Sequence, residues 1–543
     1  MEDYQLNCKL QENHSGKWLF TTSLTDVTQE ICLACIILNL ENRHSLNIRK
    51  IYYLSVLCNI MHADHQSITN TFEKDEKVSL HTLTVLLDLS CEENERIAGS
   101  ASDCLLLFLF HLNKEELRVA VILRLTIKIQ EEVNYLNNLG RIRIIGRLLH
   151  LFPCLVSRFF QQNTDVLHYL ASGMVYPSDE VRMSITYVFL QIYSTNEKNT
   201  NAMNIIDIVV SKGILCLLKT CLMKDLMKNI LALLKLFVAS DNRRILLLFE
   251  NSNEDINFPA LIKKLILSPE INFQVSIIQC LCHILSVKIL NEIQFQALLD
   301  ENIPEVLLEI LTGKNELLIE SVLCLLLLFS KHPLCYERCV TYGITIVIDV
   351  ALHLLSLKNW KLLHVAYDLI ISTISNDVSI FKRVSHNSIP QLFLQMIENT
   401  LKVQGSQMLL PTCILFSLIM KKDVSLPFSQ TTSIFHLSLQ QIHQFLKGQL
   451  YMNTRLKENI PYELENMPLE LKVFSCGLNV IYNFISMVQH HQNSLIIEEK
   501  FSCPFIDDSK ENSNTILQTS IPLVMQECIL TLDKTFIPFC LWS

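Results

Sequence analysis

The chain has 543 residues, of which half are apolar and 18% are charged, and its net charge of −9 excludes the generally basic surface that nucleic-acid binding requires. Only 11 residues are glycine, which disfavours sheet-rich folds and favours long helices, because glycine costs about 1 kcal/mol relative to alanine inside a helix. The 19 cysteines are scattered through apolar segments, so we interpret them as buried free thiols of a reducing compartment.

The first 27 residues are polar and poorly periodic, and we expect a flexible or capping segment over 1–27. They lack the basic-then-apolar arrangement of a signal peptide. Apolar runs elsewhere, such as 104–110 and 322–329, are far shorter than the roughly 20 residues that a membrane-spanning helix needs. We therefore expect a soluble, intracellular protein.

Residues 28–422 repeat one plan with a period of about 45 residues. Each copy has a turn residue or Asn, an apolar residue, often a proline, and then an amphipathic run. Because proline in the first turn of a helix loses no hydrogen bond, each copy predicts a helix start. The matched positions are Leu215, Pro259, Pro304, Thr345 and Pro390.

A second landmark recurs between these starts, and it consists of a polar loop followed by a helix with a small residue near its beginning. A small side chain allows two helices to approach closely. The helix that follows, as at 322–329, is apolar on all sides and must therefore be buried. The small residues are Ser184, Ala232, Ser276, Ser321 and Ala366. The same spacing extends toward the N-terminus, less regularly, through Gly146.

These repeats resemble armadillo repeats, with HEAT repeats close behind. Residues 299–355 follow the armadillo order of second helix, acidic or Asn loop, third helix, short first helix and next second helix. The resemblance covers 28–422 and implies an all-α, right-handed α-solenoid of armadillo/HEAT-like repeats. It implies a protein-binding scaffold but no particular partner, because this architecture has many uses.

The third helices differ from those of peptide-binding armadillo proteins, which carry Trp and Asn there to clamp an extended ligand. By register, Asn would fall near Leu190, Cys282 and Leu327, and Trp near Thr186, Ile278 and Leu323. Because neither residue is present, we expect the ligand to be a helix or a folded segment of a protein partner.

The segment 171–194, ASGMVYPSDEVRMSITYVFLQIYS, resembles the meiosis inhibitor protein 1 family. This resemblance implies a nuclear role in meiotic DNA double-strand break formation and homologous chromosome synapsis, with break-formation proteins as partners. Members of that family are much longer, which implies a short form or an N-terminal part. The alternative function is that of a cytoplasmic adaptor or regulatory subunit in trafficking or cytoskeletal assembly.

The repeat pattern weakens after residue 422. We expect a C-terminal helical extension over 423–488, with helices at 440–450 and 468–488. A polar run predicts a disordered loop over 489–515. The last segment, 516–543, is apolar and predicts a capping helix and tail, with a partner-docking tail as the alternative.

The sequence contains no glycine-rich phosphate loop, nucleophile elbow or His-Glu-x-x-His motif. Cys32 and Cys35 have metal-ligand spacing, but no second ligand pair follows at a suitable distance. Cys335 and Cys339 lie near His332, and core packing is the simpler interpretation of both pairs. We therefore expect no catalysis, no metal, no cofactor and no small-molecule substrate.

The candidate partner-binding residues form a basic patch of Arg141, Arg143, Arg147 and Arg158. Arg143 and Arg147 are four residues apart and share a helix face. This pattern favours contact with an acidic protein partner or a nucleic acid, although the net charge makes direct nucleic-acid binding unexpected. An ordinary solvated face is the alternative. Arg243-Arg244 and Lys263-Lys264 are weaker patches of the same kind.

Overall fold

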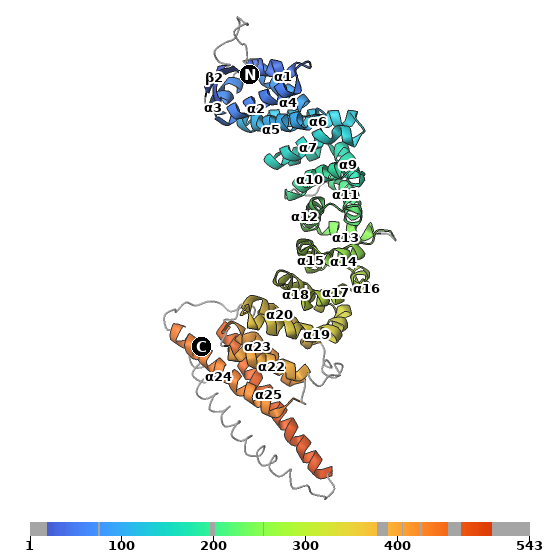
Figure 1. Cartoon of the computed structure of the whole chain (residues 1–543). Helices are drawn as coiled ribbons and strands as arrows, with labels where there is room; N and C mark the ends of the chain where they lie inside the picture. Colours follow the sequence, from blue (N-terminus) through green and yellow to red (C-terminus); the bar gives the residue numbers. More distant parts are fainter. Residues whose placement is uncertain are drawn as a thin grey trace. The chain divides into compact units, whose positions relative to one another are not determined.

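The computed structural model describes residues 19–25, 27–63, 65–73, 76–195, 201–252, 255–376, 389–403, 406–422, 426–453 and 469–501. The chain divides into two compact units, Met1–Leu261 and Ile262–Ser543. Each unit is a stack of α-helices (Figure 1). No helix in the described ranges combines the length and the hydropathy that crossing a membrane requires.

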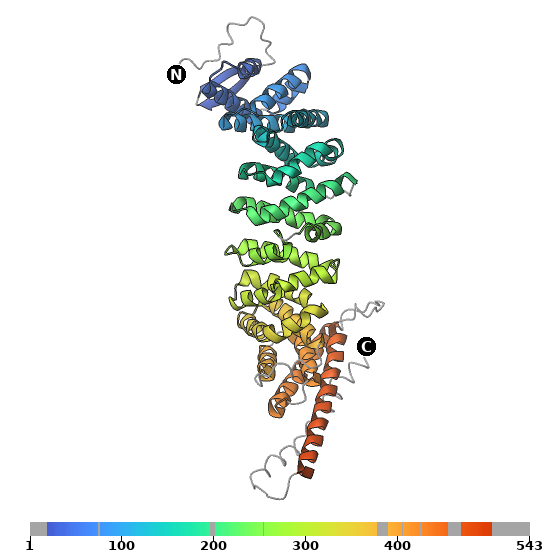
Figure 2. The ribbon, with the colours of Figure 1, turned by 90° about the vertical axis from the view of Figure 1, so that its right-hand side faces the viewer.

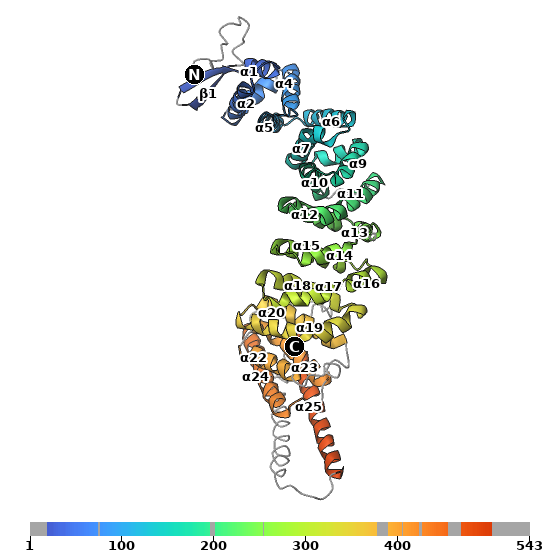
Figure 3. The same cartoon turned by 45° about the vertical axis from the view of Figure 1, so that its right-hand side comes forward.

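The described part of the chain begins with a β-hairpin, which the sequence analysis did not predict (Figure 3). Strand β1 (Leu19–Thr25) pairs antiparallel with β2 (Val27–Cys32), with Leu19 opposite Cys32 and an irregular register near the turn. Threonine, valine and isoleucine in these strands favour extended backbone. The helical array therefore starts at α1 (Leu33–Glu41), not at residue 28, and residues 1–18 lie outside the described part.

The first unit contains two rows of helices. Helices α2, α5, α7, α10 and α12 each contact the next one, and we call them the inner helices; α4, α6, α9, α11 and α13 form the second row (Figure 1). The helices after α1 are α2 (Asn47–Ala63), α3 (His65–Glu73), α4 (Glu76–Leu89), α5 (Glu95–Leu112), α6 (Glu115–Glu131), α7 (Tyr135–Leu151), α8 (Leu155–Gln162), α9 (Thr164–Ser172), the 3-10 turn η4 (Gly173–Val175), α10 (Asp179–Ser194), α11 (Asn201–Thr220), α12 (Lys224–Ser240), α13 (Asn242–Glu250) and α14 (Phe258–Ile266), in which the unit boundary falls.

The second unit repeats this arrangement. Its inner helices are α15, α18, α20, α23 and α25, and its second row contains α17, α19, α22 and α24. Figure 2 shows α25, in red, running beyond the helices against which it packs. The helices are α15 (Ile271–Ser286), α16 (Glu292–Asp300), α17 (Ile303–Thr312), α18 (Glu316–Ser330), α19 (Pro333–Ser356), α20 (Trp360–Asn376), α22 (Ile389–Lys402), the 3-10 turn η5 (Ser406–Met408), α23 (Leu409–Lys422), α24 (Phe428–Asn453) and α25 (Leu469–Phe501).

The predicted fold class, an α-solenoid of armadillo/HEAT-like repeats, is confirmed. Helices α16, α17 and α18 reproduce the armadillo order of a short first, a second and a third helix. Pro259, Pro304 and Pro390 are each the second residue of a helix, as predicted. The predicted starts at Leu215 and Thr345 are wrong, because both residues lie inside the longer helices α11 and α19.

The two longer helices pass through Gly213 and Gly343, where a first and a second helix are fused. No glycine in the described ranges has a positive φ, so neither residue ends its helix in the left-handed conformation that commonly terminates one. Both glycines serve close packing instead. A Cβ added to Gly343 would lie 2.6 Å from Leu308 Cδ1, and one added to Gly213 would lie 2.9 Å from Met174 Cβ.

All five predicted inner-helix starts are confirmed in α10, α12, α15, α18 and α20. The small residues follow the predicted packing rule only in part. Ser184 and Ala366 are buried, whereas Ala232 is exposed. Gly146 is buried in α7, and a Cβ there would lie 2.8 Å from Tyr187 Cδ1 on α10. The rule therefore holds where two inner helices cross closely and fails where the position faces solvent.

The C-terminal helices are longer than predicted. Helix α24 starts at Phe428, before the predicted 440–450, and α25 extends through Phe501. Residues 489–501 are therefore helical, which contradicts the start of the predicted disordered loop 489–515. Residues 502–543 lie outside the described part, so the capping helix over 516–543 stays a prediction.

The cysteines whose side chains the structure describes are free thiols. Most are buried or half-buried, as predicted, and Cys104 donates a hydrogen bond from its Sγ to the carbonyl oxygen of Leu54, 3.2 Å away. Cys154 is the exception, because it is exposed. Cys32 is buried and Cys35 half-buried, which agrees with core packing.

Gly146→Ala and Gly99→Ala test the close approach of the inner helices, since both glycines lie in inner helices of the first unit. We expect Gly146→Ala to lower the free energy of unfolding by about 1–3 kcal/mol, because the added methyl group overlaps Tyr187. Gly99 has no atom within 4 Å of its added Cβ, so Gly99→Ala should raise stability by about 0.5–1 kcal/mol. Urea unfolding followed by circular dichroism measures both changes, and equal effects would contradict the packing argument.

Candidate protein-binding site

The exposed face of α7 carries two of the predicted arginines, and both are paired across helices. Arg147 forms an ion pair with Asp103 of α5. The Arg143 Nη2 atom lies 3.2 Å from Glu180 Oε2 of α10. All four side chains are between 41% and 61% exposed. Arg143 and Arg147 thus lie on one side of α7, as their spacing indicates, and each also contacts a neighbouring inner helix.

The same face continues toward the C-terminal end of α7. His150 Nδ1 lies 3.1 Å from Gln191 Oε1 of α10, and the His150 ring is 6.1 Å from the ring of Tyr187. Partial burial raises the pKa of Tyr187 above its ordinary value. We call the exposed surface made by Asp103, Arg143, Arg147, His150, Glu180 and Tyr187 the inner face.

The contacts between α7 and α10 advance in the same direction along both helices. The two helices therefore run parallel, and their N-terminal ends lie at the same edge of the first unit. In order along α7, Arg143, Gly146 and His150 contact Glu180, Tyr187 and Gln191.

Arg141 lies on another side of α7, away from the pairs of Arg143 and Arg147. Its Nη1 donates to the carbonyl oxygen of Lys128, at 3.1 Å, and to Asn138 Oδ1, at 2.6 Å. Arg158 lies on α8, where its Nη2 is 3.1 Å from Glu115 Oε1 of α6. The structure thus separates the four predicted arginines into three places, and their binding of a partner stays a prediction.

Charged pairs between successive repeats recur along the array. The paired residues are separated by about one repeat in sequence, and they join neighbouring helices of one row. Because exposed ion pairs contribute about 0–1 kcal/mol each, they align the repeats more than they stabilise them. Further examples are Glu41 with His81, Asp88 with Lys128, Lys263 with Glu301, and Glu320 with Lys361.

The prediction of a weaker basic patch at Arg243-Arg244 is wrong for Arg244, because this residue is buried. Arg244 Nε lies 2.7 Å from Asp207 Oδ2, with each side chain only 3% exposed. Tyr193 donates from its hydroxyl to Asp207 Oδ1 at 2.6 Å, and the Arg244 guanidinium lies over the Tyr193 ring at 4.7 Å. Burial raises the pKa of Asp207, although the charge of Arg244 acts in the opposite direction. Sequence alone could not separate Arg243, which is exposed, from its buried neighbour.

The third-helix positions that would carry Asn and Trp differ in exposure. Leu190, Cys282 and Leu327 are half-buried, whereas Thr186, Ile278 and Leu323 are buried. The half-buried positions carry leucine or cysteine, whose side chains offer no amide for clamping a peptide backbone. The inner helices therefore lack the chemistry for binding an extended peptide in that manner.

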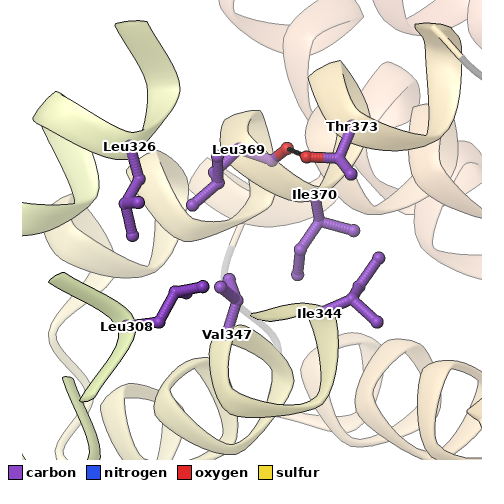
Figure 4. Close-up of a pocket in the computed structure, with 7 residues that line it drawn as sticks. All are labelled: Leu308, Leu326, Ile344, Val347, Leu369, Ile370 and Thr373. Carbon is purple, nitrogen blue, oxygen red and sulfur yellow. Dashed lines mark hydrogen bonds between the residues drawn. The ribbon is translucent and has the colours of Figure 1, made fainter. Parts of the chain in front are cut away.

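The second unit contains a small cavity between α17, α18, α19 and α20 (Figure 4). Its volume is about 10 Å³, which is at the lower limit for one water molecule. The single polar side chain is that of Thr373, whose hydroxyl donates to the Leu369 carbonyl oxygen at 2.7 Å. The cavity is a packing gap without room for a ligand. It is lined by Leu308, Leu326, Ile344, Val347, Leu369, Ile370 and Thr373.

A larger, open groove of about 360 Å³ lies between α23 and α25. Leucine and isoleucine side chains line it on α23, and Lys472, Ser475, Cys476 and Asn479 line it on α25. These residues include no carboxylate or histidine that could act with Lys472 or Cys476. No group of three His, Cys, Asp or Glu side chains within the described ranges could hold a metal ion.

Comparison with known protein families shows one match that covers most of the array. Residues 31–476 match the family model described as the Meiosis inhibitor protein 1 N-terminal domain. The sequence resemblance noted over 171–194 is thus confirmed and extends to nearly every repeat.

Two curated relatives bear the same name. The chain is 24% identical to Meiosis inhibitor protein 1 of Homo sapiens over 365 residues, which cover 64% of this chain and 28% of that protein. It is 23% identical to the Mus musculus protein over 356 residues, 63% of this chain and 27% of the relative. The chain therefore spans less than a third of the length of the curated relatives it matches.

Among solved structures, an engineered protein resembles this fold. It is 13% identical, with a TM-score of 0.51, and the match covers 83% of this chain and 98% of the engineered chain. At this identity the likeness supports the fold alone.

Arg244→Met and Arg243→Met test the buried ion pair with a matched control. Removing Arg244 leaves Asp207 buried without its cation, so we expect a loss of about 3–5 kcal/mol in the free energy of unfolding. The same change at exposed Arg243 should alter it by less than about 0.5 kcal/mol. Urea unfolding of the full chain measures both values, and a small effect at Arg244 would show that the pair does not hold these helices together.

Proposed function

The chain belongs to the meiosis inhibitor protein 1 family, and from that premise we propose that it is a nuclear, non-catalytic scaffold for proteins that form meiotic DNA double-strand breaks. The proposal includes a role in homologous chromosome synapsis, which depends on the same partners. It concerns the part of the family's length that this chain spans.

One observation carries the proposal, namely that the family match and the helical array coincide. The match runs over 31–476, and the array runs from α1 at Leu33 into α25, which begins at Leu469. What the family shares in this region is thus a stack of helices, and stacked repeats act by presenting extended surfaces to other macromolecules.

The inner face has the composition of a protein interface. Arginine and tyrosine are enriched among residues that dominate binding energies, and Arg143, Arg147 and Tyr187 lie there together. Alternating acidic and basic side chains on α5, α7 and α10 favour a partner with a complementary mixed pattern. A helix or folded segment fits this face, because the amide ladder for an extended peptide is absent.

A pull-down with the full chain from germ-line tissue tests the meiotic role. We expect mass spectrometry to recover break-formation proteins. We also expect Arg143→Glu with Arg147→Glu to reduce their recovery by at least about 10-fold, because two interface arginines are reversed in charge. Arg124→Glu on α6, an exposed arginine of the second row that donates to Thr84 Oγ1, is the matched control and should leave recovery unchanged. Recovery of cytoplasmic trafficking or cytoskeletal proteins alone would favour the adaptor function instead.

Direct DNA binding should be weak. The exposed arginines of the inner face are paired with carboxylates, and the net charge is −9. In a filter-binding assay with duplex DNA at physiological salt, we expect only weak association that falls steeply as salt increases. Tight, salt-resistant binding would contradict a scaffold that acts through proteins.

A further inference from the structure

Exposed apolar side chains recur at one place in successive repeats, the joint that precedes each inner helix. In the first unit, Val133 before α7 is 80% exposed, Val175 before α10 is 51% exposed, and Leu222 before α12 is 95% exposed. Single exposed apolar residues are common on protein surfaces, but recurrence at one structural position is not random. The second unit has the same feature at its own joints, with Leu267, Leu357 and Val403, and Leu317 is exposed in the first turn of α18.

A cluster of three tyrosines connects the joint before α7 with the joint before α10. The rings of Tyr135 and Tyr169 are stacked, with centroids 4.3 Å apart, and Tyr176 lies 5.1 Å from Tyr135. The Tyr135 hydroxyl donates to the Tyr169 carbonyl oxygen at 2.7 Å, and the Tyr169 hydroxyl donates to the Val133 carbonyl oxygen at 3.1 Å. With exposed Leu136 and Val175 beside them, these residues form an apolar and aromatic surface. We call Val133, Tyr135, Leu136, Tyr169, Val175 and Tyr176 the tyrosine patch.

Buried polar contacts hold the tyrosine patch in place. Asn138, fully buried, donates from Nδ2 to Tyr169 Oη at 3.1 Å and to the Glu132 carbonyl oxygen at 2.6 Å. Arg182 donates from Nε to the Tyr176 carbonyl oxygen. A surface that is rigid before binding loses little conformational entropy when a partner docks. The tyrosine patch is therefore suited to binding.

Acidic side chains border the tyrosine patch on the side of α7, where Glu131 and Glu132 precede Val133. On the side of α10, Asp179 and Glu180 follow Tyr176 and are paired with Arg182 and Arg143. Hydrogen bonds from the Asn134 backbone and then the Asn137 side chain hold the pKa of Glu132 below its ordinary value, so this carboxylate remains ionised.

Two of the nearby basic side chains, those of Arg141 and Arg182, are directed into the structure. Arg141 donates to Asn138 and to the Lys128 carbonyl oxygen. Arg182 donates to the Tyr176 carbonyl oxygen and pairs with Asp179 at 3.3 Å. A docking partner therefore meets the carboxylates of Glu131 and Glu132 at one edge of an apolar centre, and charge complementarity favours a basic partner.

We propose that the tyrosine patch is a second protein-binding surface, which takes an amphipathic helix whose apolar face is flanked by lysine or arginine. A helix fits because helix recognition depends on apolar anchors and pockets, whereas an added strand needs an exposed sheet edge, and the joints before α7 and α10 are flanked by helices. The tyrosine patch is built from α7, α9 and the joints before α7 and α10, and it shares none of its residues with the inner face.

Two synthetic amphipathic helices test this proposal, with the same leucine face and with either lysine or glutamate flanks. Fluorescence anisotropy with the full chain at physiological salt should show at least about 10-fold tighter binding of the lysine peptide. Leu136→Asp with Val175→Asp should weaken that binding by about 10-fold or more. Both side chains are exposed, so an unchanged melting temperature is expected and confirms that the variant is folded.

Ile293→Asp on α16 is the matched control, because Ile293 is 80% exposed and lies in the second unit. It should leave binding unchanged, and so should Arg147→Glu, whose partner Asp103 does not border the tyrosine patch; this second control separates the proposal from that of the inner face. Hydrogen exchange should show protection at 131–137 and 173–180 on adding the lysine peptide. Equal binding of both peptides, or no effect of the patch variant, would overturn the proposal.

Discussion

The array depends on one constraint: no repeat can bury its own apolar face. In α18, the side chains of Val322, Leu323 and Leu325 are fully buried because α15 and α20 flank this helix within its unit. Complete burial stabilises such a side chain by about 1.5–3 kcal/mol, but only while both neighbours are in place. Each inner helix is therefore stable through the repeats on either side, and the same dependence explains why half of the residues are apolar.

This constraint also decides which parts of the molecule remain for recognition. Stacking covers the apolar sides of the inner helices and leaves their charged sides and the joints between helices exposed. On the charged sides, pairs such as Arg143 with Glu180 connect neighbours one repeat apart. At the joints, the chain exposes valine, leucine and tyrosine in a rigid setting. Exposed charged groups and exposed apolar groups thus lie on different surfaces of the same repeats.

The sequence predicts the inner helices well because two local signals agree there, a polar loop and an apolar run. It predicts helix starts correctly at proline, as at Pro304, and incorrectly where a glycine continues a helix, as at Gly213. Whether the chain starts a new helix or continues the old one at such a position depends on packing partners that are distant in sequence. The local sequence therefore does not show it. The same holds for the candidate site. Spacing correctly places Arg143 and Arg147 on one face of a helix, but only tertiary contacts show that Arg141 lies apart from them and that Arg244 is buried.

The buried pair of Arg244 and Asp207 has a consequence for how copies of similar repeats keep their order. Apolar faces are interchangeable, since one leucine-rich helix packs acceptably on another. A buried arginine is not interchangeable in this way, because its charge needs a carboxylate on the neighbouring helix. Here that carboxylate is Asp207, which also accepts a hydrogen bond from the Tyr193 hydroxyl. A helix from another repeat packed in place of α11 would leave the Arg244 charge buried without a carboxylate, so this pair disfavours a wrong order of repeats within the first unit.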